Sequence, residues 1–224
     1  TSTETAPSPN RVLAQCTSGI PCANYQIVNA TSSHIPVNSS AAVALLAIVP
    51  GESFVPGDVA GGGKSGSVLS QVVGTTVPVT VRLVDRFYNR VAKPSPTPSV
   101  RLASDDPFAN SGEEVSLSTG QYAIGGFYFR KANTSTGWRI FATTAAGSAA
   151  TNIAFSTSPY IVVNATTTSR LLALLPGQTF DPGNEAAGGK LEGFANATAG
   201  SAYQVTIQAT DRYYNAKSTD TAVF

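Results

Sequence analysis

The sequence predicts an all-β protein, and three observations lead to this class. Only 12% of the residues are Asp, Glu, Lys or Arg, so the chain has few of the helix-favouring charged faces that long surface helices present to water. Thr, Val, Ile, Tyr and Phe fill the periodic segments, and these residues fit the pleated surface of a sheet. The chain also contains 20 Gly and 14 Pro, which recur in the Pro-Gly, Ser-Gly and Thr-Gly pairs typical of turns.

Individual strands are predicted where apolar residues stand at every second position. Val77, Val79, Val81 and Leu83 alternate with less apolar residues, and residues 203–209 repeat the pattern. A period of two indicates a strand with one buried face and one wet face. Further strands are predicted at residues 115–117, 124–129 and 138–143. Several short strands between regular turns indicate a β-sandwich.

An internal repeat with an offset of 126 residues organises the chain, because Leu45 aligns with Leu171. The run LLAIVPGESFVPG that begins at Leu45 matches LLALLPGQTFDPG without a gap, and further on GGK matches GGK and DRFYN matches DRYYN. The same offset relates three earlier pairs, which are Ile35 and Ile161, Val37 and Val163, and Asn38 and Asn164. Such repeats are the signature of an array of similar structural units.

The repeat divides the chain into three parts. Residues 1–22 form an N-terminal arm, residues 23–149 the first repeat and residues 150–224 the second repeat. The second repeat lacks counterparts of about residues 101–149, so we expect it to be an incomplete sandwich. The alternative is that the missing strands follow Phe224 in the same polypeptide.

The order of the motifs resembles the tandem immunoglobulin-like (Ig-like) repeats of large bacterial surface and extracellular proteins. Pro-Gly-x-x-x-x-Pro-Gly comes first, then a Gly-Lys turn, then an alternating strand that runs into Asp-x-x-x-Asn, and later the turn Ser104-Asp105-Asp106. The resemblance covers about residues 35–143 and 161–224. It implies tandem Ig-like β-sandwiches, which serve as stalks, adhesins or fibres. In that family further strands follow the Asp-x-x-x-Asn strand, and the second repeat departs from the pattern by stopping early.

Composition argues against two classes of partner. The net charge is +1 and the chain has no long basic run, whereas a protein that binds nucleic acid needs a positive stripe to neutralise phosphates. The longest apolar run, residues 41–49, is too short to span a bilayer.

The two cysteines, Cys16 and Cys22, predict a small local disulfide in the arm. Gly19 and Pro21 lie between them and favour a tight loop. A disulfide implies an oxidising compartment, so we expect an extracellular or cell-surface protein. The alternatives are two free thiols or half of a metal site, but a zinc site needs more ligands and His34 is the only histidine.

The Gly-Lys turn has the appearance of a phosphate-binding loop. Asp58 stands where such a loop has its first glycine, and its carboxylate repels phosphate. In the second repeat Leu191 follows Lys190, so the hydroxyl that would hold magnesium is missing. The sequence therefore predicts a Gly-rich turn between strands, with no nucleotide cofactor.

The shared Asp-x-x-x-Asn motif is a weak calcium candidate at Asp85, Asn89, Asp211 and Asn215. Carboxylate and amide oxygens at strand ends bind calcium, but calcium normally takes six or more oxygens and each loop shares only one acid. We favour the interpretation that these side chains cap turn amides at a strand end.

No set of residues predicts catalysis. A Ser-His-Asp triad would have to use His34, and no nucleophile elbow lies near it. Glu113 and Glu114 are adjacent, so in a strand their carboxylates point to opposite faces. We therefore expect that the protein is not an enzyme.

Five Asn-x-Ser/Thr sequons predict N-linked glycans. Asn38 and Asn164 occupy the same repeat position, and both keep Ser or Thr two places later. Exposed Asn in a secreted chain carries bulky, solubilising glycans in such sequons, although the sequon alone is not sufficient. The five sites are Asn29, Asn38, Asn133, Asn164 and Asn196.

These observations predict a structural subunit of an extracellular, glycosylated fibre that assembles with itself, head to tail, by β-strand complementation. The expected donor is the arm, in which Arg11, Val12, Leu13 and Ala14 are the most strand-like residues. The alternative is a cell-surface adhesin or a carbohydrate-binding stalk module. In that case the paired aromatic residues of the DRFYN and DRYYN motifs would form a small sugar platform.

Overall fold

The computed structural model describes residues 10–16, 29–150 and 152–217, and it contains no helix in this part of the chain. The predicted all-β class is therefore confirmed. No described helix has the length and hydropathy needed to cross a membrane. The chain divides into two compact units, Thr1–Ser39 and Ser40–Phe224, which we describe separately.

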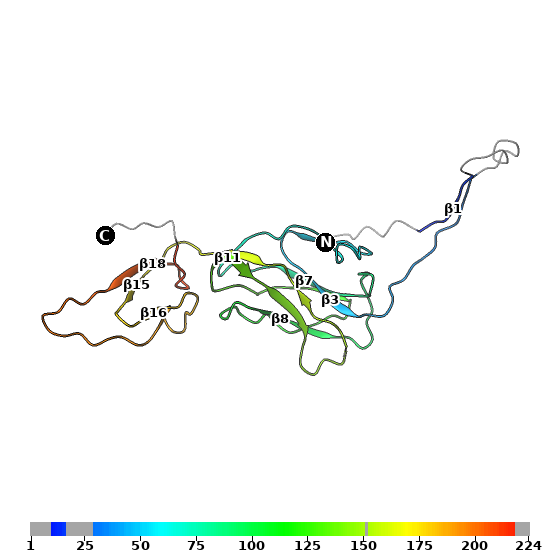
Figure 1. Cartoon of the computed structure of the whole chain (residues 1–224). Coiled ribbons are helices and arrows are strands. Elements are labelled where there is room, and N and C mark those ends of the chain that lie inside the picture. Colours follow the sequence, from blue (N-terminus) through cyan, green and yellow to red (C-terminus); the bar gives the residue numbers. More distant parts are fainter. Residues whose placement is uncertain (1–9, 17–28, 151, 218–224) are drawn as a thin grey trace. The chain divides into compact units, whose positions relative to one another are not determined.

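Three sheets of the second unit surround one hydrophobic core, which we call the first core (Figure 1). Their strand orders are β10-β7-β3, β13-β12-β8-β9 and β11-β14-β6. The strands are β3 (Ala44–Ile48), β6 (Gln71–Val72), β7 (Val79–Val84), β8 (Ser99–Ser104), β9 (Val115–Ser116), β10 (Gln121–Ile124), β11 (Asn133–Trp138), β12 (Ile140–Thr144), β13 (Ser156–Thr157) and β14 (Ile161–Asn164).

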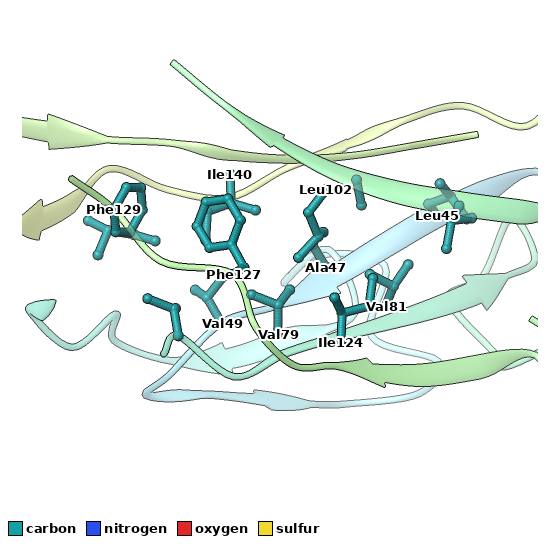
Figure 2. Close-up of a cluster of buried hydrophobic side chains, with 14 of the residues drawn as sticks. Leu45, Ala47, Val49, Val79, Val81, Leu102, Ile124, Phe127, Phe129 and Ile140 are labelled. Atoms are coloured by element: carbon teal, nitrogen blue, oxygen red, sulfur yellow. The ribbon is translucent and has the colours of Figure 1, made fainter. Parts of the chain in front are cut away.

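Alternation along β7 determines which face of its sheet enters the core. Val79 and Val81 are 0% exposed, while Thr80 between them is half-buried. Figure 2 shows both valines pointing into the same cluster as Phe127, which follows β10 beside β7, and as Leu102, which comes from β8 on the other side of the core. Full burial of a Val, Leu or Phe side chain contributes about 1.5–3 kcal/mol. Packing of sheets on both sides of this cluster gives a sandwich-like arrangement.

A β-hairpin covers the opposite face of the β3–β7 pair. It consists of β4 (Glu52–Phe54) and β5 (Lys64–Gly66), which pair antiparallel. The Arg82 guanidinium of β7 lies 4.3 Å from the centre of the Phe54 ring, and Leu46 of β3 is only 5% exposed. Both faces of β3 are therefore covered.

The second repeat builds the same pair of strands and the same hairpin, in the same register. Its strands are β15 (Arg170–Leu174), β16 (Thr179–Phe180), β17 (Lys190–Leu191) and β18 (Thr206–Thr210). β3 pairs with β7 from Ala44 opposite Val84, and β15 pairs with β18 from Arg170 opposite Thr210, which are the same positions 126 residues later. The sequence repeat is thus also a repeat of strand pairing.

The first core extends past the sequence boundary at residue 149. β13 pairs with β12, and β14 pairs antiparallel with β11 and parallel with β6. Ile161 and Val163 of β14 are 0% exposed within this core. The segment that opens the second repeat in sequence therefore completes the first core in space.

Two predicted strands differ from the observed ones. The strand expected at residues 124–129 instead ends at Ile124, because Gly125 and Gly126 interrupt it, although Phe127 and Phe129 after the interruption are fully buried. The segment expected at residues 138–143 spans the end of β11 and most of β12. The separate pairings of these strands, with β14 and with β8, explain the division.

The described part of the first unit contains one pair of short strands, β1 (Leu13–Ala14) and β2 (Ala30–Thr31). An isolated antiparallel bridge between Asn10 and Ile35 extends this pairing. Cys22 lies outside the described residues, so its disulfide with Cys16 stays a prediction.

Candidate assembly interface

One face of the β15–β18 sheet is apolar and exposed, whereas the same face of the first repeat is the core. Ile207 is 50% exposed and Val205 42%, but their counterparts Val81 and Val79 are 0% exposed. Leu171 is 60% exposed and its counterpart Leu45 only 3%. Because both sheets have the same register, this difference comes from what covers the sheet and not from a change in the sheet itself.

Residues of β8, β12 and the segment after β10 cover this face in the first repeat. Leu102 of β8 and Ile140 of β12 are fully buried against this face, together with Phe127 and Phe129 (Figure 2). Phe127 and Phe129 also pack edge to face, with ring centres 5.2 Å apart. All four lie in residues 101–149, outside the segments that align between the two repeats.

The β15–β18 sheet is also open at one edge. In the first repeat β10 pairs with the outer edge of β7, opposite β3. In the described part of the second repeat, β18 pairs with no strand except β15, although its last residue, Thr210, is bridged to Ala216. An unpaired strand edge presents free N–H and C=O groups, which favour pairing with another chain.

The second repeat contacts the first core through the DRYYN turn. The Asn215 side chain donates to the Arg130 carbonyl at 2.8 Å and accepts from the Ala132 N–H at 2.8 Å. Tyr213 is 6% exposed and its ring centre lies 6.5 Å from that of Tyr128. A buried asparagine that pairs with two main-chain groups fixes the orientation of one segment on another.

Asp106 prepares the main chain that Asn215 contacts. It is 3% exposed, and its Oδ2 accepts from the N–H groups of Arg130 and Lys131 at 2.8 and 3.1 Å. Its Oδ1 accepts from the Phe108 N–H. The predicted Ser-Asp-Asp turn is therefore a support for the contact between the repeats.

Sequence reasoning did not distinguish Asn215 from Asn89. The two residues have the same neighbours in DRYYN and DRFYN, so the motif itself carries no signal for the bridging role. The exposed counterpart of Tyr213 is Phe87, which is 45% exposed.

The four calcium candidates form two turn caps with the same geometry. Asp85 Oδ1 accepts from the N–H groups of Phe87 and Asn89, both at 2.9 Å, and Oδ2 accepts from the Ser40 N–H at 2.9 Å. Asp211 makes the corresponding bonds with Tyr213, Asn215 and Thr166. Main-chain donors therefore contact both oxygens of each carboxylate.

Burial acts to raise the pKa of Asp85, but the hydrogen bonds from Ser40, Asn89 and Phe87 outweigh it and hold the pKa below the usual 3.8. The carboxylate is 2% exposed and thus stabilised in its charged form by main-chain dipoles. This is the behaviour of a structural cap.

The Gly-Lys turn holds the hairpin against the sheet. Lys64 Nζ lies 2.9 Å from Glu52 Oε1 and donates to the Ala47 carbonyl at 3.2 Å. The turn also contacts an aromatic ring, because a Cβ on Gly63 would lie 2.7 Å from three atoms of Tyr88. The lysine and the glycines thus have structural partners within the repeat.

The proposed sugar platform is not equivalent in the two repeats. Phe87 is exposed, but Tyr213 is buried against the first core. Tyr88 and Tyr214 each lie over a glycine of their own Gly-Lys turn, Gly63 and Gly189. In the second repeat the aromatic pair therefore serves packing.

The five sequons lie in different surroundings. Asn29, Asn38 and Asn196 are exposed. Asn133 is half-buried and its Nδ2 donates to the Gly137 carbonyl at 2.8 Å, while Asn164 is half-buried with a long 3.4 Å contact to the Gln71 carbonyl. Attachment of a glycan at Asn133 would require this turn to rearrange, and the modification of all five sites stays a prediction.

The remaining candidates do not gather into a site. Within the described segments, no group of three or more His, Cys, Asp or Glu side chains lies close enough to hold a metal ion. The guanidinium of Arg11 contacts the His34 ring, and both side chains are exposed.

No family model, curated protein or solved structure matches this chain. The resemblance to Ig-like repeats therefore rests on the sequence motifs.

Proposed function

We propose that this chain is a structural subunit of an extracellular fibre, built from Ig-like sandwiches that join head to tail by β-strand complementation. The observation that carries the proposal is the apolar face of β15 and β18. The β15–β18 sheet has the same register as the buried β3–β7 sheet, yet its Leu171, Val205 and Ile207 are exposed to water. Such a face is suited to receive strands from another molecule.

A contact of this kind joins two different surfaces. The acceptor is the second repeat of one molecule, and the donor is another part of the next molecule. Such a heterologous contact need not close on itself and so produces a filament. Glycans on the exposed sequons would raise the solubility of a weakly charged filament.

The carbohydrate-binding alternative has less support. It depends on an exposed aromatic pair, and only the first repeat offers an exposed ring at that position, Phe87. The fibre proposal rests on the exposed apolar face of β15 and β18. The equivalent face of β3 and β7 is buried in the same chain, and this direct comparison gives the fibre proposal the stronger physical basis.

Electron microscopy of the purified protein, together with two variants, tests the proposal. Ile207→Asp places a charge on the acceptor face, and burial of an unpaired charge is costly, so we expect filaments to be lost. Thr206→Asp, on the other face of the same strand, is the matched control and should retain them. Isolated particles from the unmodified protein, or unchanged filaments from Ile207→Asp, would refute the proposal.

A further inference from the structure

β14 shows how the strand that opens a repeat is used in this chain, because it completes the core that precedes it. Ile161 and Val163 of β14 are 0% exposed, whereas their counterparts Ile35 and Val37 at the opening of the first repeat are 43% and 71% exposed. Val37 belongs to no strand or bridge. Ile35 and Val37, at the start of the first repeat, are thus apolar like the residues of β14 but are exposed instead of buried in a core.

The two edges of β14 have different partners. At Ile161 it is bridged antiparallel to Trp138 of β11, and at Val163 it is bridged parallel to Gln71 of β6. The Asn164 carbonyl accepts from the Val73 N–H at 3.0 Å, so this carbonyl faces the β6 edge.

The opening of the first repeat already has a partner on one edge. Ile35 is bridged antiparallel to Asn10, with its N–H donating to the Asn10 carbonyl at 2.9 Å. Because main-chain groups alternate between the two edges of a strand, the Asn38 carbonyl, three residues later, faces the other edge. Asn10 is therefore an antiparallel partner of Ile35, just as Trp138 is an antiparallel partner of Ile161.

The second repeat contains the matching acceptor. The counterparts of Gln71, Val72 and Val73 are Ala197, Thr198 and Ala199, at the same offset of 126 residues (Gln71 to Ala197). All three are exposed, and none of them belongs to a strand. In the part of the chain that the structure describes, no strand pairs with these three residues.

We propose that residues 35–38 of one molecule insert as a parallel strand beside residues 197–199 of a second copy of this chain, as β14 lies beside β6. Val37 then pairs with Ala197, and the Ala199 N–H donates to the Asn38 carbonyl. Residues 10–14 accompany this strand in the position of β11. The inference rests on the proposed fibre function. It identifies residues 35–38 as the inserted strand and the arm as the strand that pairs with it.

Substitution of Val37 tests the donor. In filaments of the full chain, Val37→Asp should raise the concentration needed for assembly by at least about tenfold, because a charge would enter an apolar core. Val59→Asp is the matched control, since Val59 is also an exposed valine, at 55%. If the unmodified protein forms no filaments, the fibre function and this inference both fail. If Val37→Asp assembles like the control, only this inference fails.

Cross-linking tests the register. Molecules with Val37→Cys are mixed with molecules with Ala197→Cys, oxidised mildly and mapped by mass spectrometry. We expect a disulfide between positions 37 and 197 of different molecules, and none when Val59→Cys replaces Val37→Cys. Filaments without the 37–197 link, or with a link from Val12→Cys in its place, would overturn the inference.

Discussion

Asn215 and Asn89 occupy the same position in the repeat, yet only Asn215 bridges two repeats. Both side chains contact the aspartate four residues earlier, at 3.2–3.3 Å. Asn215 in addition joins the main chain at Arg130 and Ala132 and is 1% exposed. One motif therefore caps a turn in one context and also locks a contact between repeats in the other.

Asn215→Ala should destabilise the protein by about 1–3 kcal/mol more than Asn89→Ala, because it leaves the Arg130 carbonyl and the Ala132 N–H without their partner. Urea unfolding of both variants measures the difference. Hydrogen exchange should also become faster at the Ala132 amide in Asn215→Ala alone. Equal losses of stability in the two variants would show that the bridge contributes nothing.

Gly63→Ala should cost more stability than Gly62→Ala. Gly63 and Gly62 have positive φ angles of 74° and 65°. In both variants the alanine must adopt a left-handed conformation, which lowers the free energy of unfolding by about 1–2 kcal/mol. Only a Cβ at position 63 meets Tyr88, and displacement of this ring adds about 1–3 kcal/mol. Thermal or urea unfolding compares the two, and equal values would mean that the ring moves aside freely.

Asp85 should make the protein sensitive to acid. Its folded pKa lies below the usual 3.8, so its contribution to stability is complete above that value and is lost as the pH falls through the folded pKa. Asp85→Asn should therefore be less stable than the unmodified protein at pH 7, and the difference should shrink below about pH 4. Urea unfolding across this range is the measurement, and a difference independent of pH would contradict the assignment.

Cys16 and Cys22 should be joined in the native protein. Mass spectrometry before and after reduction is expected to show a gain of two alkylated thiols only after reduction. Free alkylation of both cysteines without reductant would disprove the pairing and remove its support for an oxidising compartment.

Asn38 and Asn164 should carry glycans in protein from its native source. Peptide mapping before and after deglycosylation measures occupancy, and unmodified peptides for both sites would contradict the prediction. Recombinant protein from a host without the glycosylation machinery provides the unmodified reference.

The sequence by itself determined the strand class and the offset of the repeat. These properties are local, because period-two alternation selects strands and the same turn residues produce the same hairpins at Phe54 and Phe180. The capping role of Asp85 and Asp211 was also accessible, because a carboxylate with turn amides two and four residues later is a short-range arrangement.

Only the tertiary structure decided which surfaces are buried. Leu45 and Leu171 have nearly the same neighbours in sequence, but distant residues such as Leu102 and Ile140 cover one of them and leave the other exposed. In the same way, nothing local distinguishes Asn215 from Asn89. Burial depends on partners far away along the chain, and an alternating pattern states that a face is apolar without stating what covers it.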